Sequence, residues 1–99
     1  MFDQVLRCMQ DKIRRKDYIM TLHAEEEMNN DCLSILGVEN CILNGNIVER
    51  QKDQKTAEWK YRISWQVPYG GFGIEAIAKL SPTGKLVIIT VYTTSKKWI

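Results

Sequence analysis

Apolar residues recur with two different periods along this chain, and the change falls near Gly45. Before that glycine they recur every three or four residues, which predicts helices with one buried stripe. Beyond it they recur mainly every second residue, which is the spacing of a strand with one buried face. The chain is therefore expected to have a helical first part and a β-rich second part.

Three helices are expected in the first part. The first covers residues 2–13, where five apolar residues fall on one stripe. Thr21 is the expected N-cap of a second, short helix over residues 22–28. The third covers residues 34–43, and Gly45 with the asparagine before it is expected to supply the left-handed residue that ends this helix.

Four strands are expected in the second part. The first opens at Ile47, and the other three cover residues 59–65, 72–80 and 85–93. The polar residues 51–56 between the first two strands are predicted to form a loop. The last strand is apolar on both faces and is expected to lie centrally in the sheet, with helices on one side. Helices followed by strands with short connections predict an α+β fold and exclude a Rossmann fold, although the strand order stays open.

Composition limits the chain to one domain over residues 1–99, because 99 residues with 44% hydrophobic and 26% charged side chains are enough for one small core. Three cysteines without C-x-x-C spacing favour reduced thiols over a disulfide framework or a zinc knuckle. No apolar run is long enough to span a bilayer, and no signal sequence is recognisable, so a soluble, cytoplasmic protein is expected without a membrane partner.

The charge is unevenly distributed along the chain. Residues 1–49 carry five basic and nine acidic side chains, a net charge of −4, whereas residues 50–99 carry nine basic and three acidic side chains, a net charge of +6. This asymmetry indicates an anionic partner for the second half, and RNA and an acidic protein both meet that requirement.

Candidate chemical groups are few, because the motifs of P-loop, dinucleotide-binding, zincin and α/β-hydrolase sites are all missing from the sequence. His23 is the single histidine, and Glu27 one helical turn later either pairs with it or orients it for proton transfer. Tyr92 on the last strand is a candidate proton donor or stacking ring, with simple packing as the alternative.

Two basic residues, Lys60 and Arg62, share one face of a predicted strand, opposite its aromatic residues. Together they form either a solvated sheet surface or a clamp for phosphate and RNA. Lys79 and Arg50 are candidates for the same surface, but their facing depends on a strand register that the sequence does not determine.

Three short segments, residues 21–28, 44–49 and 89–92, resemble a family of small bacterial domains of unknown function that is grouped with RelE-like and BrnT-like toxins. The resemblance covers residues 18–93. It implies a RelE-like fold, with N-terminal helices packed on a curved, mainly antiparallel four-stranded sheet. In that family an arginine typically stands where this chain has Glu27, so the resemblance implies no phosphate-binding side chain on that helix.

The resemblance further implies the toxin of a toxin–antitoxin system, acting as a metal-independent endoribonuclease on messenger RNA, free or on the ribosome. The 2′-hydroxyl of such a substrate attacks the adjacent phosphate, which requires a base, an acid and cations. The implied catalytic residues are His23, Arg62 and Tyr92. The implied phosphate- and RNA-binding residues are Arg50, Lys60 and Lys79. No cofactor or metal is expected, and the implied partner is a cognate antitoxin, which in related systems is sometimes a zinc-finger protein.

Two other function classes stay open. The same fold without catalytic activity would serve as a protein- or RNA-binding module, and the single histidine and Glu27 favour this alternative. A small DNA-binding regulator is disfavoured because the predicted helices lie in the acidic half and none is a basic recognition helix.

Overall fold

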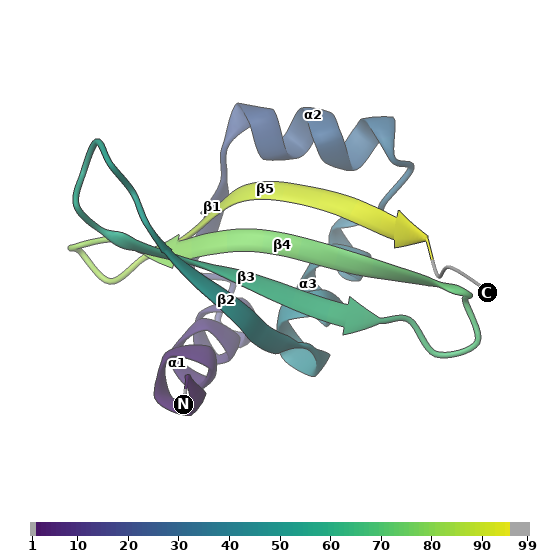
Figure 1. Cartoon of the computed structure of the whole chain (residues 1–99), viewed down its shortest axis with the longest axis horizontal. Helices are drawn as coiled ribbons and strands as arrows, with labels where there is room; N and C mark the ends of the chain where they lie inside the picture. Colours follow the sequence, from purple (N-terminus) through teal and green to yellow (C-terminus); the bar gives the residue numbers. More distant parts are fainter. Residues whose placement is uncertain (1, 96–99) are drawn as a thin grey trace.

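The computed structural model describes residues 2–95, which form three helices and five strands in one α+β unit (Figure 1). The elements are α1 (Asp3–Arg14), β1 (Tyr18–Met20), α2 (Leu22–Asn30), α3 (Ile35–Asn44), β2 (Asn46–Lys52), β3 (Trp59–Gln66), β4 (Phe72–Leu80) and β5 (Leu86–Ser95). The strands form a single sheet in the order β1-β5-β4-β3-β2. Helices α1 and α3 lie behind this sheet in Figure 1, and α2 runs along its β5 side.

The expected strand count of four is wrong, because β1 adds a fifth strand. It pairs parallel with β5, with Tyr18 opposite Leu86, whereas the other three strand pairs are antiparallel. The sheet is therefore mixed and mainly antiparallel. Three residues are too few to show a period of two, so β1 is recognisable only from its partner strand.

Strand β5 lies between β1 and β4 only over its first residues, so the central position predicted from its apolar sequence is confirmed in part. Its pairing with β1 ends at Ile88, and from there α2 covers its outer edge. Thr21 Oγ1 donates a hydrogen bond to the carbonyl of Ile89 at 2.9 Å, and Asp31 accepts one from the amide of Thr93, also at 2.9 Å. The two ends of α2 thus satisfy backbone groups that would otherwise form an open strand edge.

The predicted helix starts are confirmed. Thr21 caps α2 by accepting a hydrogen bond from the amide of Ala24 at 3.1 Å, and Ser34 caps α3 in the same way through the amide of Gly37. Helix α2 continues to Asn30, two residues beyond its predicted end.

Gly45 follows α3 in an extended conformation (φ −86°, ψ −174°), so the predicted left-handed cap is wrong. Glycine is required there for another reason. A Cβ atom at this position would lie 2.5 Å from the carbonyl oxygen of Cys41 and 2.6 Å from that of Ser64. The chain therefore passes closely between α3 and β3 as it enters β2.

The loop predicted over residues 51–56 begins two residues too early. Gln51 and Lys52 belong to β2, where they pair with Lys60 and Trp59. Cross-strand backbone hydrogen bonds hold these polar residues in the sheet, and the hydropathy pattern does not register such bonds.

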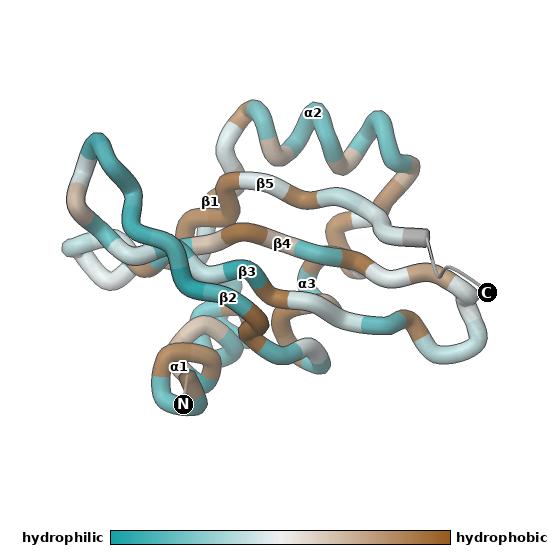
Figure 2. Tube along the Cα trace, viewed as in Figure 1, coloured by the Kyte–Doolittle hydropathy of each residue, from teal (hydrophilic) through white to brown (hydrophobic). Residues whose placement is uncertain are grey.

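The core lies between the sheet and helices α1 and α3. Its largest fully buried side chains are Met9, Ile13, Ile42, Ile63, Leu86, Ile88, Val38, Val91 and Cys41. Figure 2 shows the corresponding hydrophobic positions along the central strands and a largely hydrophilic β2–β3 hairpin. Burial raises the pKa of the Cys41 thiol to about 12, so this thiol is a packing group rather than a nucleophile. Cys8 and Cys32 are exposed free thiols.

No helix in residues 2–95 is long and apolar enough to cross a membrane.

Glu39 on α3 is a charged residue within this packed layer, with 6% of its surface exposed. Lys16 Nζ donates to both of its carboxylate oxygens, at 2.8 and 2.9 Å, and Tyr18 Oη donates to one of them at 2.5 Å. Burial alone would raise the pKa of Glu39, but these two donors and the Lys16 charge hold it below the ordinary value of 4.5.

This environment predicts an acid-sensitive contribution of Glu39 to stability. Because its pKa is lower in the folded chain than in the unfolded chain, the stabilisation is complete above pH 4.5 and is lost as the pH falls through the folded-state value. Urea unfolding at pH 7 and pH 3 is expected to show a smaller pH-dependent loss for Glu39→Gln than for the parent chain. Equal losses in the two proteins would contradict this assignment.

Candidate functional site on the open face of the sheet

The face of the sheet opposite α1 and α3 carries a row of polar side chains, and it is turned toward the viewer in Figure 1. Strand register decides which residues share this face. Ser64 lies opposite Glu75, and Glu75 lies opposite Tyr92, so the three side chains project from neighbouring positions of β3, β4 and β5. Arg62 projects from the same face of β3, two residues from Ser64.

Glu75 is the centre of this polar cluster. Its Oε1 accepts hydrogen bonds from Tyr92 Oη at 2.6 Å and from Arg62 Nη1 at 2.9 Å, and its Oε2 accepts one from Ser64 Oγ at 3.2 Å. Only 14% of the Glu75 side chain is exposed. Burial alone would raise its pKa, but the donors and the Arg62 charge hold it below the ordinary value, so this carboxylate is ionised at neutral pH.

Arg62 joins this cluster to β2. Its Nε donates to Glu49 Oε1 at 3.0 Å, so the guanidinium bridges two carboxylates, and 32% of its side chain remains exposed. The hydrogen bonds that Arg62 donates to Glu75 and Glu49 raise the pKa of its guanidinium. Burial, together with the neighbouring Glu75, likewise raises the pKa of Tyr92, so the phenol keeps its proton at neutral pH.

The other two predicted cations of this face continue the polar row toward the β2–β3 hairpin. Lys60 is the next β3 residue on this face beyond Arg62, and alternation along β4 places Lys79, which follows the Tyr61–Ala78 pair, on the same face. Lys79 Nζ lies 2.8 Å from Glu58 Oε1. No carboxylate of residues 2–95 lies within ion-pair distance of Lys60, which leaves its ammonium available to an anionic ligand.

Arg50 lies on the other face of the sheet, apart from the basic residues it was expected to join. It pairs with Tyr61 in the register, and its guanidinium lies 4.0 Å from the ring centroid of Trp59 and 5.8 Å from that of Phe2. This is a packing role through cation–π contacts. The β-bulge between Ile47 and Glu49 shifts the register, and this shift was not recognisable from the sequence.

His23 lies near the start of α2, outside β5, whereas Arg62 is two strands further into the sheet. Its Nε2 lies 3.1 Å from Glu27 Oε1, within ion-pair distance of the predicted neighbour, but no hydrogen bond joins the two atoms, and 64% of the His23 side chain is exposed. Its proposed role in proton transfer stays a prediction.

Two carboxylates of this cluster, Glu49 and Glu75, were missed by the sequence reasoning. A signal for Glu75 was present, because it is the only acidic residue in the otherwise largely apolar strand of residues 72–80. The hydrogen-bond partners of Glu75 come from two different strands, β3 and β5, so their convergence depends on register. Lys96 and Lys97, which contribute to the positive charge of the second half, lie outside the described residues.

The cluster brings together a carboxylate that can accept a proton, a phenol that can donate one, and a cation. Nothing in residues 2–95 groups three histidine, cysteine or acidic side chains as metal ligands. The structure therefore defines a small α+β protein with a hydrogen-bonded carboxylate, phenol and guanidinium on an open sheet face.

The chain belongs to a family described as a domain of unknown function, DUF4258, whose model matches residues 20–93. No curated protein and no solved structure matches the chain. The matched region includes all of β2, β3 and β4 and most of β5, and it therefore contains the Glu75 cluster.

Proposed function

We propose that this protein is a metal-independent endoribonuclease and that the open sheet face is its active site. The observation that carries the proposal is the Glu75 carboxylate, which lies within hydrogen-bond distance of both the Tyr92 hydroxyl and the Arg62 guanidinium. When a ribose 2′-hydroxyl attacks its neighbouring phosphate, the reaction requires a base, an acid and a cation.

In the proposed reaction Glu75 takes the proton of the 2′-hydroxyl as its oxygen attacks phosphorus. Tyr92 gives a proton to the departing 5′-oxygen, and Arg62 stabilises the negative charge that develops on the phosphate. The products are a 2′,3′-cyclic phosphate and a 5′-hydroxyl. Because Tyr92 Oη is 2.6 Å from Glu75 Oε1, the proton gained by Glu75 can return directly to Tyr92 and restore the site.

This proposal moves the role of base from His23 to Glu75, because the carboxylate contacts Arg62 and Tyr92 whereas the imidazole pairs with Glu27 on its own helix. Lys60 and Lys79 are proposed to hold the phosphates that flank the scissile bond. In the proposed biological setting the protein is a toxin, and a cognate antitoxin covers this face.

The charge balance on the face favours a second candidate function, a non-catalytic RNA- or protein-binding module. Arg62 is already paired with Glu49 and Glu75, and Lys79 with Glu58. A phosphate must displace at least one of these carboxylates before Arg62 or Lys79 can stabilise a transition state, whereas Lys60 needs no such exchange to bind an anionic partner.

The two functions are separated by incubating the purified chain with a labelled single-stranded RNA in the presence of a metal chelator. Catalysis predicts a 2′,3′-cyclic phosphate end and no cleavage when the scissile nucleotide carries a 2′-deoxyribose. Binding without any cleavage would support the module and overturn the nuclease. Absence of both binding and cleavage would exclude the open face as an RNA site.

A further inference from the structure

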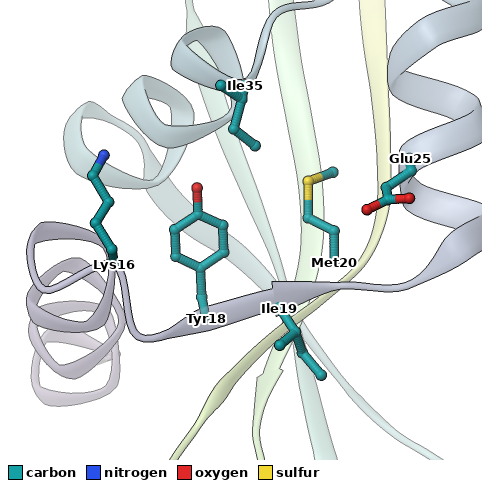
Figure 3. A pocket seen from close by; sticks show the side chains of 6 residues that line it. All are labelled: Lys16, Tyr18, Ile19, Met20, Glu25 and Ile35. Carbon is teal, nitrogen blue, oxygen red and sulfur yellow. The ribbon is translucent and has the colours of Figure 1, made fainter.

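The outer edge of β1 opens onto a pocket of about 470 Å³ (Figure 3). This pocket lies between the end of α1, the beginning of α3 and the first turn of α2. Its lining residues are Lys16, Tyr18, Ile19, Met20, Glu25 and Ile35. All three residues of β1 contribute, so the strand edge itself forms part of the pocket wall.

The backbone of β1 leaves hydrogen-bonding groups directed into this space. The amide of Thr21 donates a hydrogen bond to the carbonyl of Ile88, so the backbone groups of Thr21 point toward β5. Because these directions alternate along a strand, the backbone groups of Ile19 also point toward β5. Tyr18 and Met20 then direct theirs outward. No residue of 2–95 hydrogen-bonds to the backbone groups of Tyr18 and Met20 on that side.

The side chains around the edge give the pocket a defined polarity. In Figure 3 the Glu25 carboxylate points toward Met20, and Tyr18 and Met20 project to the same side of the strand. Among residues 2–95 no basic group lies within ion-pair distance of Glu25. At the other end Lys16 is neutralised by Glu39, at 2.8 Å. The pocket therefore carries one uncompensated negative charge beside apolar surface from Met20 and Ile35.

We infer that the β1 edge and its pocket bind an extended segment of a partner protein, in which a lysine or arginine and an apolar residue are two positions apart. The segment adds a strand to the sheet by pairing with the outward backbone groups of Tyr18 and Met20. Two of its side chains then enter the pocket, and the basic one lies beside Met20 and reaches Glu25. This inference does not depend on RNA cleavage, since it concerns the opposite end of the sheet from β3.

The geometry favours such a segment over a second copy of this chain. A symmetric dimer would bring the same surface of both copies together, and two hollowed edges leave a gap between them instead of interlocking. The edge is only three residues long, so side-chain contacts in the pocket must supply much of the affinity and the specificity.

The test is selection of a random decapeptide library, displayed on phage, against the intact chain and two charge-reversed variants. Glu25→Lys reverses the charge in the pocket, and Glu26→Lys makes the same change on the neighbouring exposed position of α2. The parent and Glu26→Lys are expected to enrich peptides with the basic-x-apolar pattern. Glu25→Lys is expected to bind these peptides at least roughly tenfold more weakly. Enrichment of the same peptides by Glu25→Lys, or no enrichment by the parent, would overturn the inference.

Hydrogen exchange with a selected peptide tests the added strand separately. The peptide is expected to protect the amides of Tyr18 and Met20, while that of Ile19 is already protected by β5. Binding without new protection at Tyr18 and Met20 would disprove strand addition. A concentration-dependent dimer of the parent chain that Glu25→Lys abolishes would identify a second copy as the occupant and overturn the proposed partner.

Discussion

Replacing Glu75 with glutamine is expected to slow RNA cleavage by roughly 100-fold or more, the scale of a lost general base. Glutamine keeps the size of the side chain but does not accept the 2′-hydroxyl proton. RNA binding is expected to change far less, because Lys60 and Lys79 stay in place. The measurement is single-turnover cleavage of a labelled RNA together with its dissociation constant.

The control for this variant is Glu26→Gln, which removes a carboxylate from the exposed side of α2 and is expected to leave cleavage unchanged. Tyr92→Phe removes the hydroxyl that donates to Glu75 and is expected to slow cleavage as well. Since the pKa of Glu75 lies below its ordinary value, the parent rate is expected to persist into mildly acidic solution. A folded Glu75→Gln variant that cuts at the parent rate would exclude Glu75 as the base.

Replacing Gly45 with alanine is expected to destabilise the fold by about 3 kcal/mol, the upper part of the range for overpacking in a tight interior. The added methyl group would lie 2.5 and 2.6 Å from two backbone carbonyl oxygens, one on α3 and one on β3. Neither oxygen can move without shifting its element. The measurement is the free energy of unfolding in urea.

Gly37→Ala is the matched control, because it makes the same substitution within α3. A Cβ atom there would meet only ordinary contacts, at 3.5 Å from Ile74 and 3.6 Å from Ser34. Alanine is the better helix former, so this variant is expected to gain about 0.5–1 kcal/mol. Equal changes in the free energy of unfolding at the two positions would show that the close approach of the carbonyl oxygens at Gly45 does not exclude a methyl group.

Much of the fold was predictable because its longer elements carry strong periodic patterns. The stripe along α1 and the alternation along β3 each extend over several residues, and Thr21 and Ser34 are capping residues in sequence as well as in structure. The short strand β1 was not predictable, since its only distinguishing feature is its partner β5. The conformation of Gly45 was also missed, because it depends on the distance between α3 and β3.

The candidate site was predictable only in part. Alternation along β3 correctly assigned Lys60 and Arg62 to one face, opposite Tyr61. It did not reveal that Arg62 is held between Glu49 and Glu75, nor that Arg50 faces the other way beside Trp59. Those relations join residues from different strands, and the bulge in β2 shifts one of these strands relative to its neighbour.

The sequence by itself determined the α+β class, the starts of the helices and the residues that share a face within each strand. These properties are local, because they follow from side-chain spacing and from capping groups a few residues apart. The tertiary structure alone decided the strand order, the parallel β1 edge with its pocket, and the meeting of Glu75 with Arg62 and Tyr92. Cross-strand register brings together residues 13 and 17 positions apart in the chain, and no local pattern encodes that pairing.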